Sequence, residues 1–453
     1  MEALQLRSLI TEFGGESRGR DGTITGVAID SRRVQPGDLF IALRGERVDG
    51  HDCIAAAARA GAAAALVDHY TDAALPQWRV DNPRLVLIEL ACRARSASRA
   101  RVVGVTGSNG KTTVKEMLAA ILGRCGLTRA TDGNLNNELG VPLTLSRIGP
   151  DDDFAIVEMG CGKPGDIALL ASWARPQVGV VTHAGPAHLQ GFGSVAAVAD
   201  CKGELFEELP AKGHAIINAD DPYAALWEQK AAHCHIKRFS LDGHPAEVSG
   251  VETTDGQLEI RFEDAALTVA VPLPGRHNRA NALAAAAAAR ASGASLEAIG
   301  EGLRSVAPAT GRLQDRRGVQ SMTLIDDSYN ANPASLTAAL ETLTASAAPV
   351  WLVLGDMAEL GDAGPAMHRQ AGEQARALGV ERLFATGPLA ARAVEGFGEQ
   401  GEWFATRGEL IEALTAAAQP AVTVLIKGSR AAAMDEVVTA LAVGGPEEER
   451  ACS

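Results

Sequence analysis

The chain has 453 residues, more than a single hydrophobic core normally serves, so two to four domains are expected. Its 56 acidic residues outnumber 42 basic ones, and the net charge of -14 argues against binding to nucleic acid or to an anionic membrane surface. The 7 cysteines form no CxxC pair and no zinc spacing, which is typical of a protein of the reducing cytoplasm.

The start of the chain is of mixed polarity, so we expect no signal peptide. Two alanine-rich runs, at 55–66 and 280–291, are too short or too charged to span a bilayer and predict helices packed closely on sheets. We therefore expect a soluble, cytoplasmic α/β protein without a membrane span.

Residues 1–83 predict a small α/β domain. Its expected elements are strands at 24–29, 38–43 and 64–67 and a helix at 53–60. Ser31 and Arg32 follow the first strand, where a hydroxyl, a guanidinium and loop amides can hold a phosphorylated group. On local evidence alone, a solvated ion pair in a turn is the favoured interpretation.

Residues 84–313 predict a second domain, built on a parallel sheet. The expected strands, at 102–106, 154–157, 178–181 and 215–217, are uninterrupted apolar runs. Such runs are typical of parallel strands that are buried on both faces. Polar residues follow each run, and because the carboxyl ends of parallel strands share one edge, these residues should converge.

The first of these strands leads through a glycine-rich loop into a helix predicted at 112–122. The loop consists of Gly107, Ser108, Asn109, Gly110, Lys111, Thr112 and Thr113. Its backbone N–H groups and the positive end of the helix can bind phosphate, the Lys111 ammonium can reach terminal phosphates, and the Thr112 hydroxyl can ligate Mg²⁺. The spacing between the glycines is shorter than in a standard P-loop. The loop thus predicts a variant triphosphate site; the alternative is a glycine turn beside a surface lysine.

Three further residues of this domain are candidate metal ligands. Glu158 ends a buried strand, where an Mg²⁺ ligand or a structural cap is expected. His188 lies in the loop after the third strand and is as well explained by a structural hydrogen bond as by a metal. Lys202 lies in an otherwise acidic helix predicted at 194–209, and locally an ion-paired surface lysine is favoured.

After residue 313 the strand-and-helix pattern restarts, which predicts a Rossmann-like domain over 314–453. Its expected strands lie at 322–325, 350–354, 382–385 and 422–426. Candidate ligand contacts are Asn281 for an adenine edge, Arg312 for a γ-phosphate, Asp327 for ribose hydroxyls, and Lys427 and Arg430 for a carboxylate. Asn281 could instead cap the helix that it begins.

Taken together, these motifs closely resemble those of the Mur ligases of bacterial cell-wall synthesis over nearly the whole chain. The most specific are Thr106-Gly-Ser-Asn-Gly-Lys-Thr-Thr113, Gly133-Asn-Leu-Asn-Asn-Glu138, Ala187-His-Leu-Gln-Gly-Phe-Gly193, Lys202-Gly-Glu204, Leu273-Pro-Gly-Arg-His-Asn278, Asp326-Asp-Ser-Tyr-Asn-Ala-Asn-Pro333, Gly355-Asp-Met-Ala-Glu-Leu-Gly361 and Lys427-Gly-Ser-Arg430. The segments 133–138 and 328–333 are similar to those of the family member that adds a terminal dipeptide.

The resemblance implies an α/β fold of three domains and an ATP-dependent amide ligase. A central P-loop-type parallel-sheet domain (84–313) would be flanked by an N-terminal UDP-substrate domain (1–83) and a C-terminal Rossmann-like domain (314–453) that binds the incoming dipeptide. ATP would phosphorylate the terminal carboxylate of UDP-N-acetylmuramoyl-tripeptide, and the amine of D-alanyl-D-alanine would attack the acyl phosphate, releasing ADP and phosphate. This is a step of peptidoglycan precursor synthesis, and the resemblance implies a monomer.

The resemblance also assigns residue roles. It implies two Mg²⁺ ions, which neutralise the phosphate and carboxylate charges, and a carbamate on Lys202, which reverses the local interpretation of that residue. The implied metal ligands are Thr112, Glu158, His188 and Lys202, and the implied catalytic residues are Lys202, Lys111, His188 and Glu158. The implied ATP contacts are the phosphate loop with Asn281, Arg312 and Asp327. The implied substrate contacts are Ser31 and Arg32 for UDP, Asn134 and Asn137 for the muramoyl-peptide, and Lys427 and Arg430.

Several positions depart from the family pattern. They are His183 for Asn, Gln190 for an acidic residue, Asp166 for Glu, and Val48 and Cys53 for aromatic residues. None removes a charge that the chemistry needs. The segment 81–84 spells the diaminopimelate motif of a sister enzyme, but it lies far from the C-terminal position that such a role requires, and it predicts a turn.

Two other functions stay open from sequence alone. A related amide ligase, such as a folylpolyglutamate synthase or a sister Mur ligase, would share the ATP site, although segment 133–138 and the intact first domain argue against folate. A nucleotide switch that hydrolyses ATP only to move its domains would share the phosphate loop.

Overall fold

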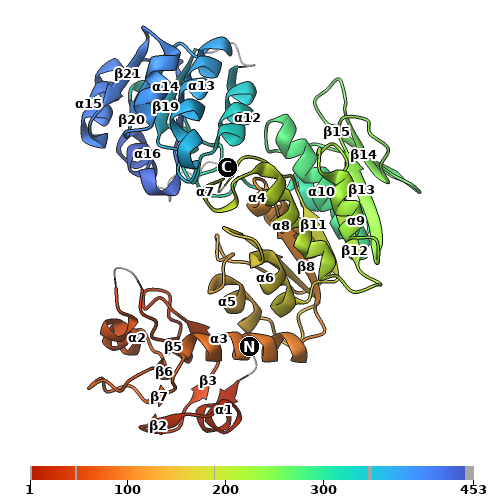
Figure 1. Cartoon of the computed structure of the whole chain (residues 1–453), viewed down its shortest axis with the longest axis vertical. Coiled ribbons are helices and arrows are strands. Elements are labelled where there is room, and N and C mark those ends of the chain that lie inside the picture. Colours follow the sequence, from red (N-terminus) through yellow and green to blue (C-terminus); the bar gives the residue numbers. More distant parts are fainter. Residues whose placement is uncertain (1–2, 46–47, 188, 345–348, 444–453) are drawn as a thin grey trace.

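The computed structural model describes residues 3–45, 48–187, 189–344 and 349–443. This part of the chain forms three α/β units in sequence order, each on its own main sheet (Figure 1). The α/β fold class is as expected, whereas the boundaries after residues 83 and 313 remain predictions. No helix of the described residues is long and apolar enough to cross a membrane.

The N-terminal unit is built on a five-stranded sheet of order β2-β7-β6-β5-β4, which is parallel except at its β2 edge. Its elements are β1 (Leu4–Gln5), α1 (Leu6–Phe13), β2 (Glu16–Arg18), β3 (Thr23–Ile24), β4 (Gly26–Ala28), β5 (Asp38–Ile41), η1 (Gly50–Cys53), α2 (Ile54–Arg59), β6 (Ala64–Val67) and β7 (Gln77–Arg79). Trp78 fills the core and donates its indole N–H to the Gly14 carbonyl at 2.8 Å. The expected strand at 24–29 is split between β3 and β4, and the first alanine-rich run is split between α2 and β6.

Helix α3 (Pro83–Ala97) leads into the central unit and packs against α5 (Gly140–Ser146) and α6 (Asp166–Ala174). The segment 81–84, expected to be a turn, begins this helix. Pro83 occupies its first turn, and the Asn82 side chain accepts a hydrogen bond from Leu85 N at 3.1 Å as the N-cap.

The central unit is built on a nine-stranded sheet of order β16-β15-β14-β13-β12-β11-β8-β10-β9. Its strands are β8 (Arg101–Thr106), β9 (Thr128–Ala130), β10 (Phe154–Glu158), β11 (Val178–Val181), β12 (His214–Asn218), β13 (His235–Ser240), β14 (Val248–Glu252), β15 (Leu258–Phe262) and β16 (Ala266–Val269). The four expected strands are confirmed as β8, β10, β11 and β12, all parallel. Strands β15 and β16 at one edge are antiparallel, and the sequence pattern missed them because they are only partly buried.

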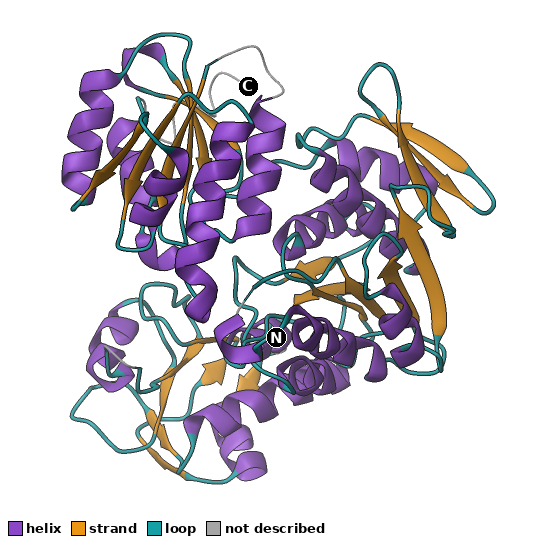
Figure 2. Ribbon diagram, turned by 45° about the horizontal axis from the view of Figure 1, so that its top comes forward, coloured by secondary structure: helices purple, strands orange, loops and turns teal. Residues whose placement is uncertain are grey.

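Helices cover both faces of this sheet (Figure 2). They are α4 (Lys111–Leu122), α5 (Gly140–Ser146), α6 (Asp166–Ala174), α7 (Leu189–Phe192), α8 (Val195–Glu207), α9 (Ala224–Lys230), α10 (Arg276–Ala291) and α11 (Leu296–Arg304). Helices α4, α10 and α11 pack on one face, and α6, α8 and α9 pack on the other. The second alanine-rich run is a helix, as expected: alanines between 282 and 289 are buried in α10, where their small size permits close packing.

The C-terminal unit is a six-stranded sheet of order β17-β18-β22-β19-β20-β21, parallel except for β17. Its elements are β17 (Gln314–Arg317), η2 (Val319–Ser321), β18 (Thr323–Asp327), α12 (Pro333–Thr344), β19 (Val350–Gly355), η3 (Gly361–Ala363), α13 (Gly364–Ala377), β20 (Arg382–Thr386), α14 (Ala390–Phe397), β21 (Gly401–Phe404), α15 (Arg407–Ala417), β22 (Thr423–Lys427), η4 (Arg430–Ala432) and α16 (Asp435–Leu441). The four expected strands are confirmed as β18, β19, β20 and β22. The segments after β18, β19 and β22 line a cavity at the boundary with the central unit, whereas the segment after β20 does not.

Candidate active site

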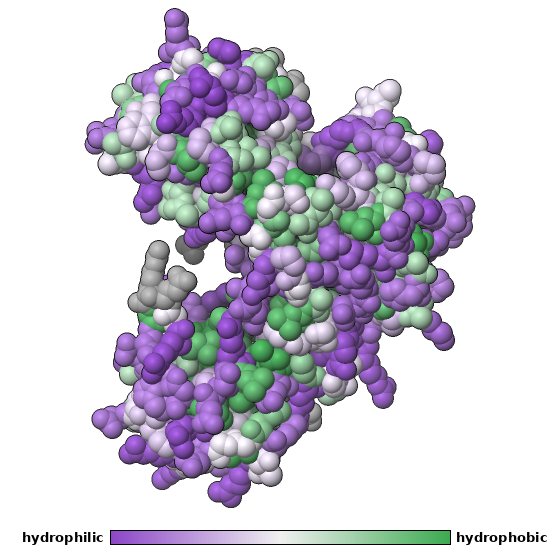
Figure 3. All heavy atoms as spheres, viewed as in Figure 1, coloured by the Kyte–Doolittle hydropathy of each residue, from purple (hydrophilic) through white to green (hydrophobic). Residues whose placement is uncertain are grey.

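A cavity of about 810 Å³ lies where the central and C-terminal units meet. Figure 3 shows one face of the molecule, and this face is hollowed between the C-terminal and N-terminal units. The cavity is lined by residues of the phosphate loop, of segments 134–138, 158–162 and 306–313, and of the strand ends after β18 and β22. Residues after β8, β10 and β11 therefore converge as expected, whereas the polar residues 218–221 after β12 are not among those that line the cavity.

The phosphate loop between β8 and α4 requires its two glycines. Gly107 has φ +151 and Gly110 has φ +80, in the region that side chains disfavour. A Cβ on Gly107 would collide with the Thr182 hydroxyl, and one on Gly110 would collide with the Asn281 amide. The loop therefore packs directly against β11 and α10.

Side chains and backbone hold the loop in place. Ser108 N donates to the His183 carbonyl at 2.9 Å, and the Thr182 hydroxyl donates to the Asn109 carbonyl at 2.6 Å. The His183 ring is buried, and this burial lowers its pKa to about 4. A neutral imidazole thus occupies the position where the family pattern has Asn, and its Nε2 lies 3.4 Å from the Asn109 amide nitrogen.

Lys111 begins α4 and is folded back onto the loop. Its Nζ donates to the Gly107 carbonyl at 2.7 Å. Burial, reinforced by the nearby charge of Lys202, lowers the pKa of Lys111 to about 8. A bound phosphate group would favour the charged form of this amine, because an adjacent anion offsets the loss of solvation.

Arg312 reaches the phosphate loop from the hinge that leads to the C-terminal unit. Its Nη2 donates to the Thr112 hydroxyl at 3.2 Å, and its guanidinium lies over the Tyr329 ring, 4.5 Å from the ring centre. The aromatic face holds the guanidinium in the cavity without neutralising it. The expected proximity of Arg312 to the phosphate site is thus present.

A reciprocal amide pair joins the phosphate loop to the C-terminal unit. Asn332 Nδ2 donates to Asn109 Oδ1 at 2.7 Å, and Asn109 Nδ2 lies 3.3 Å from Asn332 Oδ1. Asn332 also caps α12, since its Oδ1 accepts from Ser335 N at 2.9 Å. The same side chain therefore serves a local cap and an interdomain contact.

Replacing Asn332 with serine separates these two roles. Serine can cap α12 but is too short to reach Asn109, so we expect kcat/KM for ATP to fall about 5- to 10-fold, with a change in unfolding free energy below about 0.5 kcal/mol. Steady-state kinetics and urea unfolding measure both. Asn332→Ala, which also removes the cap, should lose about 1 kcal/mol of stability in addition. Equal kinetics in the wild type and Asn332→Ser would contradict a role for the amide pair.

Glu158, at the end of β10, is a buried carboxylate at the cavity. Its Oε1 accepts from Asn136 Nδ2 at 2.8 Å, whereas Oε2 has no hydrogen-bond partner among the described residues. A buried carboxylate oxygen left without a donor fits a cation ligand, because burial without compensation is costly.

Asn136 is a contact that the sequence did not single out. The predicted residues on either side of it, Asn134 and Asn137, both line the cavity. Asn137 in addition uses its Oδ1 to accept hydrogen bonds from Leu139 N and Gly140 N, just before and at the start of α5. Its position three residues before the helix is the one signal that could have identified Asn137 as a cap. The substrate roles of Asn134 and Asn137 remain predictions.

Lys202 is buried in α8, with 2% of its surface exposed, so the local interpretation of a surface lysine is wrong. Its Nζ donates to Cys161 Sγ at 3.4 Å. A hydrogen bond from Cys201, with the charges of Lys202 and Lys111, lowers the pKa of the Cys161 thiol to about 5. Cys161 was not predicted. His188 lies outside the described residues.

Asp327 and Lys427, at the ends of β18 and β22, form a buried ion pair rather than two separate contacts. Lys427 Nζ also donates to the Asn330 carbonyl at 3.0 Å, and Leu313 N donates to Asp327 Oδ1 at 3.3 Å. Arg430 lines the cavity and pairs with Asp435 at 3.0 Å.

Asn281 lies in the first turns of α10, buried at the cavity, and its Nδ2 donates to Asn278 Oδ1 at 3.2 Å. Of the departures, Asp166 makes a local contact and accepts from Gly162 N at 2.8 Å. Gln190 N donates to the Glu359 carbonyl at 3.3 Å, which joins the central unit to the C-terminal unit.

Ser31 and Arg32 lie at the carboxyl end of β4, outside the cavity lining. The Arg32 side chain is 86% exposed and pairs with Asp30 at 2.6 Å, which lowers the pKa of that carboxyl. The geometry is that of a solvated ion pair, and the role in UDP binding remains a prediction. Val48 is exposed and Cys53 is half-buried.

Comparison with known proteins explains this arrangement. Residues 105–289 match the Mur ligase middle domain, residues 311–430 the Mur ligase glutamate ligase domain, and residues 23–104 the Mur ligase family catalytic domain. The UDP-N-acetylmuramoyl-tripeptide–D-alanyl-D-alanine ligase of Escherichia coli K12 is 44% identical over 451 residues, covering 98% of this chain and 100% of that protein. The chain belongs to the Mur ligase family.

Solved structures agree with this assignment. A crystal structure of MurF from Acinetobacter baumannii matches this Mur ligase with a TM-score of 0.86 and 32% identity, covering 97% of this chain and 98% of that one. MurF from Thermotoga maritima in complex with ADP matches with a TM-score of 0.77 and 27% identity, covering 92% of this chain and 96% of that one.

Proposed function

We propose that this Mur ligase joins D-alanyl-D-alanine to UDP-N-acetylmuramoyl-tripeptide, using ATP and releasing ADP and phosphate. The observation that carries the proposal is the cavity between two units, where the phosphate loop, the unpartnered Glu158 oxygen and the Arg312 guanidinium meet. Full-length relatives whose names state this activity support the choice of substrates.

The residues around the loop suit phosphoryl transfer to a carboxylate. The loop N–H groups and the start of α4 would hold the phosphate chain, while Lys111 approaches it from α4 and Arg312 from the segment that leads to the C-terminal unit. Fixed cations that need no rearrangement stabilise the charge that develops as the acyl phosphate forms. Asn281 and Asp327 would contact adenine and ribose.

Two Mg²⁺ ions belong to this proposal. Thr112, Glu158, His188 and a carbamylated Lys202 would hold them, and bound magnesium supplies Lewis-acid neutralisation of phosphate and carboxylate oxygens. Among the described residues, the unpartnered Glu158 oxygen fits this assignment. The addition of CO₂ to the Lys202 amine would replace a buried cation by an anion able to bind a cation.

The remaining assignments concern the two substrates. Ser31 and Arg32 would bind the UDP end, and Asn134 and Asn137 the muramoyl-peptide. Lys427 and Arg430 would meet the incoming dipeptide, with the Asp327 pair fixing the Lys427 ammonium. We also propose that the protein is cytoplasmic, because the described cysteines are unbridged and both the energy source and the substrate are nucleotides. We propose that it is a monomer, as its resemblance to the family implies, and sedimentation of the purified chain measures its oligomeric state.

Phosphate release tests the proposed function directly. We expect release from ATP only when UDP-N-acetylmuramoyl-tripeptide and D-alanyl-D-alanine are both present, with formation of the pentapeptide product seen by mass spectrometry. Release that ignores both substrates would indicate a nucleotide switch. Release driven by a single amino acid, or by a folate with glutamate, would indicate a sister ligase or a folylpolyglutamate synthase.

A further inference from the structure

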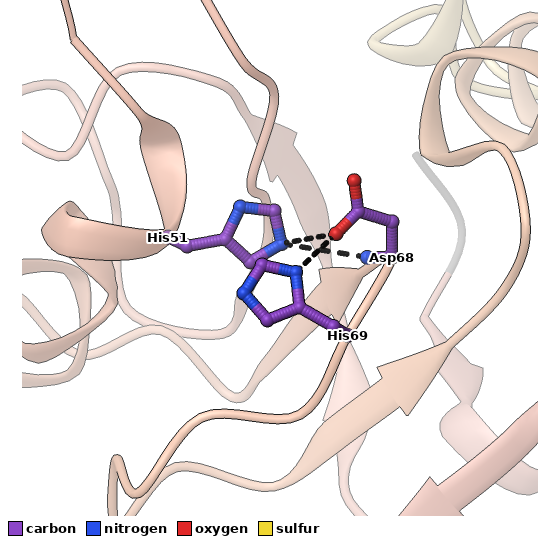
Figure 4. Close-up of side chains that lie close together, drawn as sticks. All are labelled: His51, Asp68 and His69. Carbon is purple, nitrogen blue, oxygen red and sulfur yellow. Dashed lines mark hydrogen bonds and ion pairs between the residues drawn. The ribbon is translucent and has the colours of Figure 1, made fainter.

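Three side chains of the N-terminal unit converge at the carboxyl ends of two neighbouring strands (Figure 4). His51 lies in η1, which follows β5, and Asp68 and His69 directly follow β6. His51 Nε2 lies 3.2 Å from Asp68 Oδ1, and His69 Nδ1 contacts the same oxygen. One ligand atom from each residue lies within 4.8 Å of the other two.

The His51 ring is oriented in the way that a metal-binding histidine requires. Its Nδ1 lies 2.7 Å from Asp49 Oδ1, an oxygen that also accepts from His51 N at 3.0 Å. Asp68 N donates to Nε2 at 3.4 Å. With the ring hydrogen on Nδ1, the Nε2 lone pair accepts only the long contact from Asp68 N, and Nε2 also lies beside the Asp68 carboxylate, so a metal ion bound there would take the place of that backbone donor. Metal-ligating histidines typically donate their other N–H to a carboxylate in this way.

This arrangement places two acceptors against each other in a buried position. The His51 side chain is only 4% exposed, so solvent does not separate its Nε2 from Asp68 Oδ1. Among the described residues, the long contact from Asp68 N is the donor that Nε2 has, and the Nε2 lone pair and the carboxylate oxygen repel each other unless a positive centre lies between them. A metal ion supplies that centre, and a second proton on the ring is the alternative.

The charges around the cluster favour a divalent cation. The one guanidinium near it, among the described residues, is that of Arg44, whose Nε lies 3.5 Å from Asp49 Oδ2 and 3.8 Å from Asp68 Oδ2. Arg44 therefore contacts the outer oxygens and leaves Asp68 Oδ1 facing the two rings. Two carboxylates against one guanidinium leave an excess of negative charge.

We propose that His51 Nε2, the Asp68 carboxylate and His69 Nδ1 bind one Zn²⁺ ion, with water as a further ligand. Two imidazoles and one carboxylate are donors that suit Zn²⁺ better than Mg²⁺, which prefers oxygen ligands alone. The two rings are stacked, with centres 4.2 Å apart. Because each ring binds a metal in its own plane, Zn–N distances of about 2.0–2.1 Å require His69 to rotate out of this stack. Its side chain is 49% exposed and therefore able to move.

A bound zinc ion would connect the loop after β5 to the end of β6. It would therefore stabilise the N-terminal unit at the same sheet edge that carries Ser31 and Arg32. The site is separate from the cavity at the central unit and does not depend on the ligase activity.

Zinc binding by the full chain tests this proposal. Chelator-treated protein is dialysed against ZnCl₂, bound zinc is counted by atomic emission, and affinity is measured by competition with a chromophoric chelator. Because the central cavity offers thiols and a carboxylate that could bind zinc too, the decisive quantity is the difference between variants. His69→Ala should bind one zinc ion fewer per chain and lose the zinc-dependent rise in Tm.

Two further variants sharpen the comparison. Asp49→Asn, which weakens the group that orients His51 and also the contact of Asp49 with Arg44, should reduce zinc affinity about 10- to 100-fold. His244→Ala is the matched control, because His244 is an exposed histidine paired with a carboxylate, that of Asp220, but belongs to no three-ligand cluster of the described residues. It should keep the wild-type zinc content.

The outcomes are distinct. Equal zinc content and equal Tm shifts in the wild type and His69→Ala would overturn the proposal and leave a second ring proton as the positive centre. His69→Ala could lower the Tm of the zinc-free protein through lost packing. In that case His69→Gln, which keeps more of the packing, must still bind one zinc ion fewer than the wild type. Loss of zinc from His244→Ala to the same extent would show nonspecific binding and would also overturn the proposal.

Discussion

Replacing Lys202 with alanine should remove nearly all ligase activity, with kcat lower by on the order of 10²- to 10³-fold. The side chain is 2% exposed in α8, and its Nζ lies against Cys161 at the cavity wall, where a carbamate would place an anion. Alanine removes both the amine that CO₂ would modify and the anion that would result. Phosphate release with both substrates at saturation measures the effect.

Small carboxylates should partly restore the Lys202→Ala variant. The truncated side chain leaves space for formate or acetate, which can supply the missing negative charge without a covalent bond. Lys230→Ala is the matched control, since Lys230 is an ion-paired lysine that contacts Asp200 and Glu207 of α8. It should keep its activity within about twofold, because such pairs contribute at most about 1 kcal/mol. Full activity in Lys202→Ala would refute the carbamate.

Replacing Glu158 with glutamine should also lower kcat by on the order of 10²- to 10³-fold. The unfolding free energy should change by less than about 1 kcal/mol. Glutamine keeps an oxygen for Asn136 but removes the charge of the unpartnered Oε2. The buried charge of Glu158 is costly when no cation is bound, and its attraction to Lys111 partly offsets that cost. Phosphate release against Mg²⁺ concentration and urea unfolding separate the two effects.

Asp152→Asn is the matched control for Glu158→Gln. Asp152 is also buried and precedes the same strand, β10, at its opposite end, where it accepts from Arg129 Nε and Gly149 N. Its substitution should cost about 1 kcal/mol of stability and leave activity intact. If both variants lose stability equally and activity equally, Glu158 acts through folding and not through metal binding.

Uninterrupted apolar runs predicted the inner strands of both large sheets because parallel strands are buried on both faces. Strands β13 to β16 escaped prediction because their residues are only partly buried, so that no uninterrupted apolar run marks them. The phosphate loop was predictable from local spacing. The burial of Lys202 was not, since it depends on α6 and α9 packing around α8.

It was harder to predict which residues of the site contact one another than to predict which residues belong to it. Asn136, and not its predicted neighbours, reaches Glu158, because the backbone of segment 133–138 sets which amide points inward. The pairing of Asp327 with Lys427 depends on β18 lying beside β22, which are separated by most of the C-terminal unit in sequence. The types of residue indicate the chemistry of the site, whereas the contacts between these residues depend on how the strands are arranged in the sheet.

The amide pair between Asn109 and Asn332 has a consequence for the speed of the enzyme. The pair helps to hold the central and C-terminal units together, alongside the contact of Gln190 N with the Glu359 carbonyl. Because neutral hydrogen bonds contribute only about 0.5–1.5 kcal/mol each, we expect the pair to break and reform within a catalytic cycle. A buried ion pair at the same place would be harder to separate, since each charge would be left without its partner, so we expect the uncharged contact to favour the release of products.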